Sequence, residues 1–376
     1  MRLVDEFLAL TEIDAESFHE REMADYLIKK YQELGIRLQE DDSASVTGSD
    51  SGNLYGVLPA VFPKDKDGTE MKKQENPVLF AAHMDTVQPG RGRRAVVTPD
   101  GRITSDGTTV LGADDGAAIA CITEAIRELE EEKVPHREIE LLFTTAEEAY
   151  TVGASAADLA KIRAKEAYIA DDSDVIGAYS VHEPTLISFR IEVTGRAAHA
   201  GFEPEKGISS ILAASRAIAA AEQGRIDPET TLNFGLIRGG TATNAVPEKT
   251  VVEGEIRSTV HQRALDLYEQ TAELFSKEAV AIGGFARAES TVHLIAYHVP
   301  EDSKALGNYK RVLAGLGIPL HPYPSFGGSD VNVLRRKGID GLCIGNSMYR
   351  AHTTEEYAVI DEMTRLVEIF KGLATL

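Results

Sequence analysis

The sequence lacks any stretch that approaches the ~20 consecutive apolar residues needed for a membrane-spanning helix. Acidic residues, beginning at Asp5, interrupt the N-terminal segment where a secretory signal peptide would be apolar. Only two cysteines occur, Cys121 and Cys343, and both lie among apolar residues, as is typical of reduced thiols in a protein core. We therefore expect no membrane partner and no secretion, and we expect a cytoplasmic protein.

Positive charge is also scarce. The 376 residues include 39 lysines and arginines but 60 aspartates and glutamates, which gives a formal net charge of −21. A phosphate backbone would repel such a chain, so a nucleic-acid partner is not expected. We find no internal repeat and no low-complexity segment. The length exceeds what one hydrophobic core usually holds, so two domains are expected.

The first part of the chain alternates between helical and strand patterns, with a polar stretch at 64–68 that we interpret as an exposed loop. The apolar run at 77–82 is typical of a strand buried on both faces. This alternation predicts an α/β fold, with a mixed sheet flanked by helices and functional groups at the carboxyl ends of the strands. The other patterns are helices at 3–34, 116–129 and 154–165 and strands at 53–58, 139–143 and 167–170.

The pattern changes near residue 184, where strands with strict alternation replace the continuous apolar runs. This change predicts an α+β domain inserted at 184–290, whereas residues 1–183 and 291–376 together form the α/β domain. The inserted strands are expected at 186–193, 231–237 and 250–256, and the inserted helices at 208–221 and 262–280.

A histidine and an acid follow the buried strand directly. His83 and Asp85 are two residues apart, so on a strand their side chains point to the same face. A histidine in this position can be purely structural. The acid nevertheless favours a metal ligand, because a metal-bound imidazole usually needs a second group to fix its orientation.

Three pairs of adjacent acids occupy comparable positions. Asp114-Asp115 lies in a glycine-flanked turn that opens a helix, where the acids could simply cap that helix. Glu147-Glu148 follows a strand, and neighbouring carboxylates there repel each other unless a cation neutralises them. Asp171-Asp172 also ends a strand, and His352 comes from the far end of the chain.

These sites together supply the side chains of two histidines, two aspartates and a glutamate, which are nitrogen and oxygen ligands suited to zinc. Three carboxylates and a bridging hydroxide would carry four negative charges, which two divalent ions balance. The pattern therefore predicts two Zn²⁺ ions per subunit, or two other divalent ions, that polarise a carbonyl and generate hydroxide. A further uncoordinated acid would then carry the proton.

Seven motifs give the chain a resemblance to a known family over nearly its whole length. The chain resembles the co-catalytic di-zinc peptidases that include peptidase T, aminoacylase and succinyl-diaminopimelate desuccinylase, and it is most similar to the peptidase T group. The motifs are AAHMDTV, LGADDG, TTAEE, GRAAHAG, GGTATNAVPE, GEIRS and FGGSDVN.

The resemblance implies a role for each acid and histidine of the metal set. Asp114 would bridge both ions, His83 would bind one, and His352 would complete the other. Glu148 and Asp171 would be terminal ligands on opposite ions; Asp171 is preferred to Asp172 because it aligns directly after the strand. Asp85 would clamp the imidazole of His83, Asp115 would be a neighbour only, and Glu147 would be the general base that acts on the bridging water.

The resemblance also implies that the inserted domain is a lid that forms a homodimer. His199 would stabilise the oxyanion, although it could be a plain surface histidine at the end of a strand. Asn244 and Arg257 would contact a small peptide substrate, with the guanidinium fork of Arg257 suited to a carboxylate. Arg257 could instead be an ordinary exposed strand residue. The loop of Gly327, Gly328 and Ser329 would lie along the substrate, or it is a simple glycine turn.

One departure from the family concerns Gly116, because many relatives have a lysine immediately after the acid pair. The resemblance implies an exopeptidase for di- or tripeptides, of the aminopeptidase or tripeptidase type, and the departure at Gly116 leaves the substrate open. The alternatives are an N-acyl amino-acid amidohydrolase with the same metal chemistry and a non-catalytic peptide-binding protein of the same fold.

Overall fold

The computed structural model describes residues 1–63, 76–173 and 175–376, so the loop expected at 64–68 lies outside the described residues. The chain forms two compact units. The first consists of Met1–Val181, Val299–Pro324 and Ser329–Leu376, and the second of His182–His298 and Ser325–Gly328.

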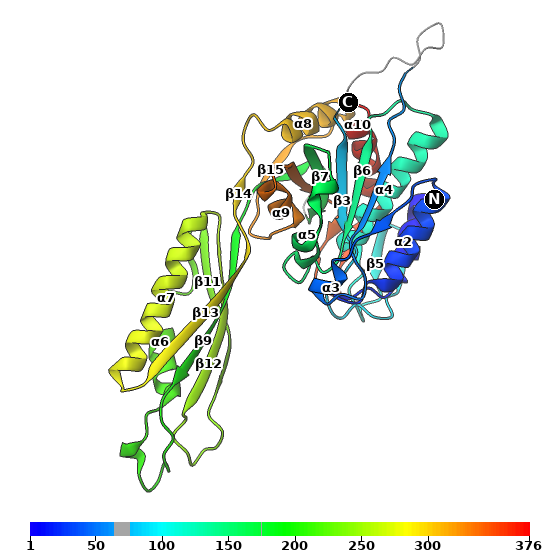
Figure 1. Cartoon of the computed structure of the whole chain (residues 1–376). Helices are drawn as coiled ribbons and strands as arrows, with labels where there is room; N and C mark the ends of the chain where they lie inside the picture. Colours follow the sequence, from blue (N-terminus) through cyan, green and yellow to red (C-terminus); the bar gives the residue numbers. More distant parts are fainter. Residues whose placement is uncertain (64–75, 174) are drawn as a thin grey trace. The chain divides into compact units, whose positions relative to one another are not determined.

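A mixed sheet forms the centre of the first unit (Figure 1), with strand order β1-β2-β6-β3-β7-β16-β8. Strand β3 runs parallel to β6 and β7, and β7 runs parallel to β16, whereas β2 is antiparallel to β6. Every residue of β3 and β6 is buried, which explains the apolar run of β3 before His83 and the mostly apolar sequence of β6. The strands are β1 (Gln39–Glu40), β2 (Leu54–Leu58), β3 (Val78–His83), β6 (Ile139–Thr144), β7 (Glu166–Asp172), β8 (Ala178–Glu183), β15 (His321–Pro324) and β16 (Asp340–Gly345).

Helices flank this sheet, as the alternating pattern predicted. Helix α4 packs against α1, α10 and strand β3, whereas α9 packs against α5 and β16. The central sheet and its helices confirm the predicted α/β fold. The helices are α1 (Arg2–Thr11), α2 (Arg21–Glu33), α3 (Ala44–Thr47), α4 (Ala113–Glu132), α5 (Val152–Ala156), α8 (Lys304–Leu316), α9 (Asp330–Arg336) and α10 (Ile360–Ala374), with a 3-10 turn at Leu159–Lys161.

The helix predicted at 154–165 was wrong. Helix α5 ends where Ala157 adopts an extended conformation, and only the short 3-10 turn follows it. The segment offers mostly small alanines to bury. The backbone amides of Arg163 and Ala164 donate to the buried carboxylate of Glu140, each at 2.9 Å, instead of to helical carbonyls. A buried acid on a neighbouring strand thus competes with helix formation.

A small antiparallel sheet in the same unit has the strand order β17-β18-β5-β4. The hairpin between β17 and β18 contains His352, and β5 leads through a turn to the start of α4. The sheet therefore connects two segments that carry predicted ligands. Its strands are β4 (Ala95–Val97), β5 (Arg102–Ser105), β17 (Met348–Tyr349) and β18 (Tyr357–Val359).

The second unit is an antiparallel sheet of order β10-β11-β12-β9-β13, with α6 and α7 packed side by side on it (Figure 1). It has its own core, which includes Ile187, Ile191 and Phe275. The elements are β9 (Thr185–Thr194), α6 (Ser210–Ala220), β10 (Gly224–Asp227), β11 (Thr230–Gly239), β12 (Lys249–Ser258), α7 (His261–Ala281), β13 (Phe285–Leu294) and β14 (Tyr297–His298), with a 3-10 turn at Pro204–Lys206.

The second unit is larger than the insert expected at 184–290. Strand β13 continues to Leu294, and β14 pairs with the end of β8, so the unit reaches His298. The short segment Ser325–Gly328 also belongs to it, because Arg257 donates a hydrogen bond to the carbonyl of Phe326 at 3.0 Å. Both cysteines, Cys121 and Cys343, are buried thiols and are not joined in a disulfide. In the parts of the chain that the structure describes, no helix has the length and apolar character to cross a membrane.

Candidate metal centre

His83 ends strand β3 at the carboxyl edge of the parallel strands, and its side chain is almost completely buried. Its Nδ1 atom lies 2.9 Å from the backbone oxygen of Asp85 and 3.3 Å from the Asp85 carboxylate. These acceptors favour a ring proton on Nδ1, so Nε2 is the nitrogen that would bind a metal ion after loss of any proton it carries. Asp85 therefore orients this imidazole.

Two groups of side chains with the composition of metal sites share Asp114. His83, Asp114 and Asp171 form the first group, and Asp114, Glu148 and His352 form the second. Within each group, one nitrogen or oxygen atom from each residue lies within 4.8 Å of the others. The structure thus brings together all five residues that the sequence singled out as ligands.

The two carboxylate oxygens of Asp114 face different histidines. Oδ1 lies 2.9 Å from Nε2 of His83, and Oδ2 lies 3.1 Å from Nε2 of His352. A carboxylate that presents one oxygen to each of two ligand groups has the arrangement of a bridge between two cations.

The donor atoms fit divalent ions such as zinc. Ligands at ~2.1 Å from a tetrahedral zinc ion lie roughly 3.4 Å from one another. In the second group, Nε2 of His352 lies 2.9 Å from Oε1 of Glu148, and in the first, Nε2 of His83 lies 3.8 Å from Oδ1 of Asp171. Oε1 of Glu148 is buried, and no donor among the described residues is aligned for a hydrogen bond to it. A cation between the ligand atoms would satisfy this oxygen.

The electrostatics of the site show what a cation would replace. Burial favours the neutral form of His83, but contact with Asp114 and Asp171 outweighs burial and raises its pKa well above the ordinary value. The carboxylates of Asp114 and Glu148 raise the pKa of His352 to about 11. Burial, assisted by the negative charge of Asp114, raises the pKa of Asp171. The carboxylates therefore favour positive charge at both histidines, and a bound divalent ion would supply positive charge in place of protons.

Glu147 is buried beside the two groups but belongs to neither. Burial, followed by the negative charge of Asp171, raises its pKa well above that of a free glutamate. The backbone amide of Glu147 donates to Oδ1 of Asp85 at 2.9 Å, and that of Glu148 donates to Oδ2 at 3.2 Å. Asp85 thus holds the acidic turn in addition to His83.

Two buried side chains that the sequence did not reveal hold the residues just before this turn. The amide of Thr145 donates to Oδ1 of Asn53 at 3.1 Å, and the amide of Ala146 donates to Oε1 of Glu20 at 3.0 Å. With Asp85, these acceptors take up four consecutive backbone amides. Ala146 has a φ of +47°, which is unfavourable for alanine, so the turn needs such support.

Neither Glu20 nor Asn53 has a local sequence signal. Glu20 precedes α2, where an acid looks like an ordinary complement to the helix dipole. Asn53 precedes β2 and resembles a turn residue. A third buried side chain, Glu356, has no local sequence signal either.

The second acids of two pairs lie outside both ligand groups. Asp115 accepts a hydrogen bond from Asn346 at 3.0 Å, and Asp172 accepts one from Ser180 at 3.0 Å. A further acid, Asp330, accepts a hydrogen bond from the hydroxyl of Thr144 at 2.6 Å. Burial raises the pKa of Asp330 to about 6.

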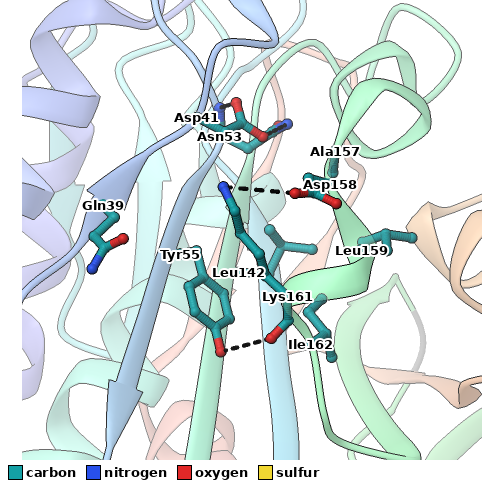
Figure 2. A pocket seen from close by; sticks show the side chains of 10 residues that line it. All are labelled: Gln39, Asp41, Asn53, Tyr55, Leu142, Ala157, Asp158, Leu159, Lys161 and Ile162. Carbon is teal, nitrogen blue, oxygen red and sulfur yellow. Dashed lines mark hydrogen bonds and ion pairs between the residues drawn. The ribbon is translucent and has the colours of Figure 1, made fainter.

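A separate pocket lies beside β2 and the 3-10 turn, and Figure 2 shows the side chains that line it. Lys161 pairs with Asp158 across the pocket at 3.8 Å, and Tyr55 donates to the carbonyl of Lys161 at 3.3 Å. Asn53 also lines this pocket, and its side-chain oxygen Oδ1 accepts the hydrogen bond from the backbone amide of Thr145. We assign the pocket no ligand, because Lys161, Asp158 and Tyr55 bind groups of the protein itself.

His199 and Asn244 lie next to each other in the second unit. The backbone amide of Ala200 donates to the carbonyl of Asn244 at 2.9 Å. Nδ1 of His199 accepts hydrogen bonds from the amides of Gly201 and Phe202, at 3.1 and 3.2 Å. The ring proton of His199 therefore lies on Nε2, which can act as a donor. Both side chains are exposed.

Arg257, Gly328 and Ser329 were also predicted to contact substrate, and two of them bind groups of the protein itself. Arg257 in the second unit binds Glu255, with Nε 2.9 Å from Oε1. Gly328 ends the segment that belongs to the same unit, whereas Ser329 belongs to the first unit. The hydroxyl of Ser329 accepts from the amide of Val331 at 3.2 Å and caps α9. This cap gives Ser329 a structural role, and contact with substrate remains a prediction.

Comparison with known proteins shows similarity along the whole chain. Residues 181–283 match the model of the peptidase dimerisation domain, and residues 68–196 match that of peptidase family M28. The uncharacterised protein YqjE of Bacillus subtilis is 38% identical over 98% of this chain and 96% of its own length.

Two solved structures share the fold at high coverage. The aminopeptidase PepT from Bacillus cereus is 37% identical, with a TM-score of 0.89 over 99% of this chain and 97% of its own. A tripeptidase from Staphylococcus aureus is 29% identical, with a TM-score of 0.91 and the same coverage of both chains. Identity at this level over the full length shows common family membership. The chain is a peptidase and belongs to the peptidase T type of the di-zinc peptidase family.

Proposed function

We propose that this peptidase removes the N-terminal residue from small peptides, tripeptides above all, with two divalent metal ions, zinc foremost. The observation that carries the proposal is the position of Asp114, which presents one carboxylate oxygen to each ligand group. The substrate class is supported by similarity to an aminopeptidase and a tripeptidase.

The five ligand residues would hold the ions, and the remaining residues would move protons and orient groups. When bound, two divalent ions polarise a peptide carbonyl and lower the pKa of water. Glu147 would accept a proton from the attacking water and deliver it to the leaving amine, because it is buried beside the ligands and belongs to neither group. Asp85 would keep the imidazole of His83 and the turn of Glu147 in place.

The second unit would supply substrate contacts and act as a lid and dimerisation domain. Nε2 of His199 carries a proton in the observed hydrogen-bond pattern and would donate it toward the oxyanion. Asn244 and Arg257 would bind the peptide, with the guanidinium of Arg257 directed at its carboxylate. Gly328 and the backbone of Ser329 would lie along the substrate.

A panel of small peptides tests the substrate class against the N-acyl amidohydrolase alternative. We expect the zinc-loaded protein to cleave trialanine, and we expect N-acetylation to lower kcat/KM by on the order of 10²-fold or more, because a site built for an amine rejects an acylated one. Faster cleavage of N-acetyl amino acids than of free peptides would instead support the amidohydrolase. Failure to cleave any of these substrates would favour the non-catalytic peptide-binding alternative.

The edge of the second unit supports a homodimer, which the match to a peptidase dimerisation domain also suggests. Strand β10 covers β11 only at residues 230–232, so in the described residues 233–239 pair with β12 alone. Leu236 and Ile237 lie on this open edge and are 50% and 52% exposed. An open edge with apolar side chains readily pairs with a second copy.

A charge on this edge should abolish the dimer. We expect light scattering coupled to size-exclusion chromatography to show a dimer for the wild type and a monomer for Ile237→Lys. Val280→Lys is the matched control, because Val280 is also exposed in the second unit but lies on α7. A wild-type monomer, or a variant that remains dimeric, would rule out this interface.

A further inference from the structure

Glu356 connects the two segments that carry the bridging and the histidine ligands. It lies four residues after His352, immediately before β18, and is 1% exposed. Its carboxylate accepts three backbone hydrogen bonds from the turn that contains Asp114. Oε2 accepts from the amides of Leu111 at 2.7 Å and Gly112 at 2.9 Å, and Oε1 accepts from the amide of Asp114 at 3.0 Å.

The backbone of Glu356 also forms hydrogen bonds, both within the His352 hairpin and to the end of β5. The amide of Glu356 donates to the carbonyl of Thr353, and the amide of Ser105 donates to the carbonyl of Glu356, at 3.1 and 3.3 Å. Strand β18 then pairs with β5, which leads to the Asp114 turn. Both main chain and side chain of Glu356 therefore fix the His352 hairpin to that turn.

The hairpin needs such an anchor because its conformation is unfavourable by itself. His352 has a φ of +65° and Arg350 a φ of +55°. Residues other than glycine adopt this region only at an energetic cost, so the surrounding structure must enforce it. His352 is also largely exposed, so burial of its side chain cannot hold it in place.

We propose that Glu356 is a positioning residue that sets the distance between Asp114 and His352 and so builds the second metal group. This inference rests on the proposed two-metal function. Glu356 belongs to neither ligand group. It acts by holding the backbone of one ligand and the hairpin of the other, as acids outside a metal's ligand sphere commonly do.

The test is metal affinity, which does not depend on catalysis. Metal-depleted protein is titrated with Zn²⁺ in competition with a chromophoric chelator. In Glu356→Gln, an amide nitrogen replaces one acceptor and leaves a buried backbone amide unpaired. We expect the wild type to bind two ions and this variant to bind at least one of them about 10–100-fold more weakly.

Two further variants separate positioning from general stability. Glu362→Gln is the matched control, because Glu362 accepts from the hydroxyl of Tyr349 in the same hairpin at 2.7 Å but does not contact the Asp114 turn. It should bind both ions as the wild type does. Glu356→Asp keeps both carboxylate oxygens and should recover part of the affinity. If Glu356→Gln does not fold, Glu356→Asp alone must still bind more weakly than the wild type.

The outcomes distinguish the two proposals. A wild-type protein that binds fewer than two ions contradicts the proposed function. A wild type with two ions, together with Glu356 variants of unchanged affinity, contradicts the positioning role alone.

Discussion

Glu147→Gln is expected to bind both metal ions and to lose about 10²–10⁴-fold in kcat on a tripeptide, the usual contribution of a general acid–base residue. The amide keeps the shape of the side chain but cannot accept a proton from water. Glu147 is outside both ligand groups, so the metal content should not change. The measurement combines steady-state kinetics with metal analysis of the same sample.

The matched control for this variant is Asp158→Asn. Asp158 lies a short way after Glu147 in the sequence, but its carboxylate lines the separate pocket of Figure 2. This control should retain wild-type kcat. If Glu147→Gln keeps both its metal and its full kcat, Glu147 is not the base, and proton transfer must be assigned elsewhere.

Asp114→Asn should have the other large effect, because Asp114 is the ligand that both groups share. We expect this variant to bind neither ion tightly and to lose about 10³–10⁴-fold in kcat/KM, which corresponds to ~4–5.5 kcal/mol of lost transition-state stabilisation. His352→Ala, by contrast, removes a ligand from only one group and should still retain one ion.

Metal content per chain separates these two variants. The expected numbers of tightly bound ions are two for the wild type, one for His352→Ala and none for Asp114→Asn. If Asp114→Asn and His352→Ala retain the same number of ions, Asp114 does not bridge the two groups.

Much of the site could be predicted because its residues follow buried strands. His83 ends β3, and the turn of Glu147 follows β6, which runs parallel to β3. Parallel strands bring their carboxyl ends to one edge, so residues far apart in sequence were expected to meet there. The continuous apolar strands also made the mixed sheet predictable.

The supporting residues could not be predicted, because their signal is purely tertiary. Glu20, Asn53 and Glu356 each bind backbone amides of a distant turn, and no periodicity or spacing marks an acceptor of that kind. The same is true of Glu140, which binds the amides of Arg163 and Ala164 where a helix was expected.

The full extent of the second unit could not be predicted from the sequence either. Residues 325–328 return to it as a short loop, held by the guanidinium of Arg257 and by the ring of Phe326, over which Arg225 stacks at 4.1 Å. A loop of four residues has no pattern that assigns it to one unit or the other. These tertiary contacts are what assign the loop to the second unit.

The central claim is that two divalent ions lie in two ligand groups that share Asp114. A crystal structure of the zinc-loaded protein, with anomalous data collected above and below the zinc edge, tests it most directly. We expect two anomalous peaks per chain, both ~2.0–2.2 Å from oxygens of Asp114, one beside His83 and Asp171 and the other beside Glu148 and His352. A single peak, or two peaks of which one lies away from Asp114, would contradict it.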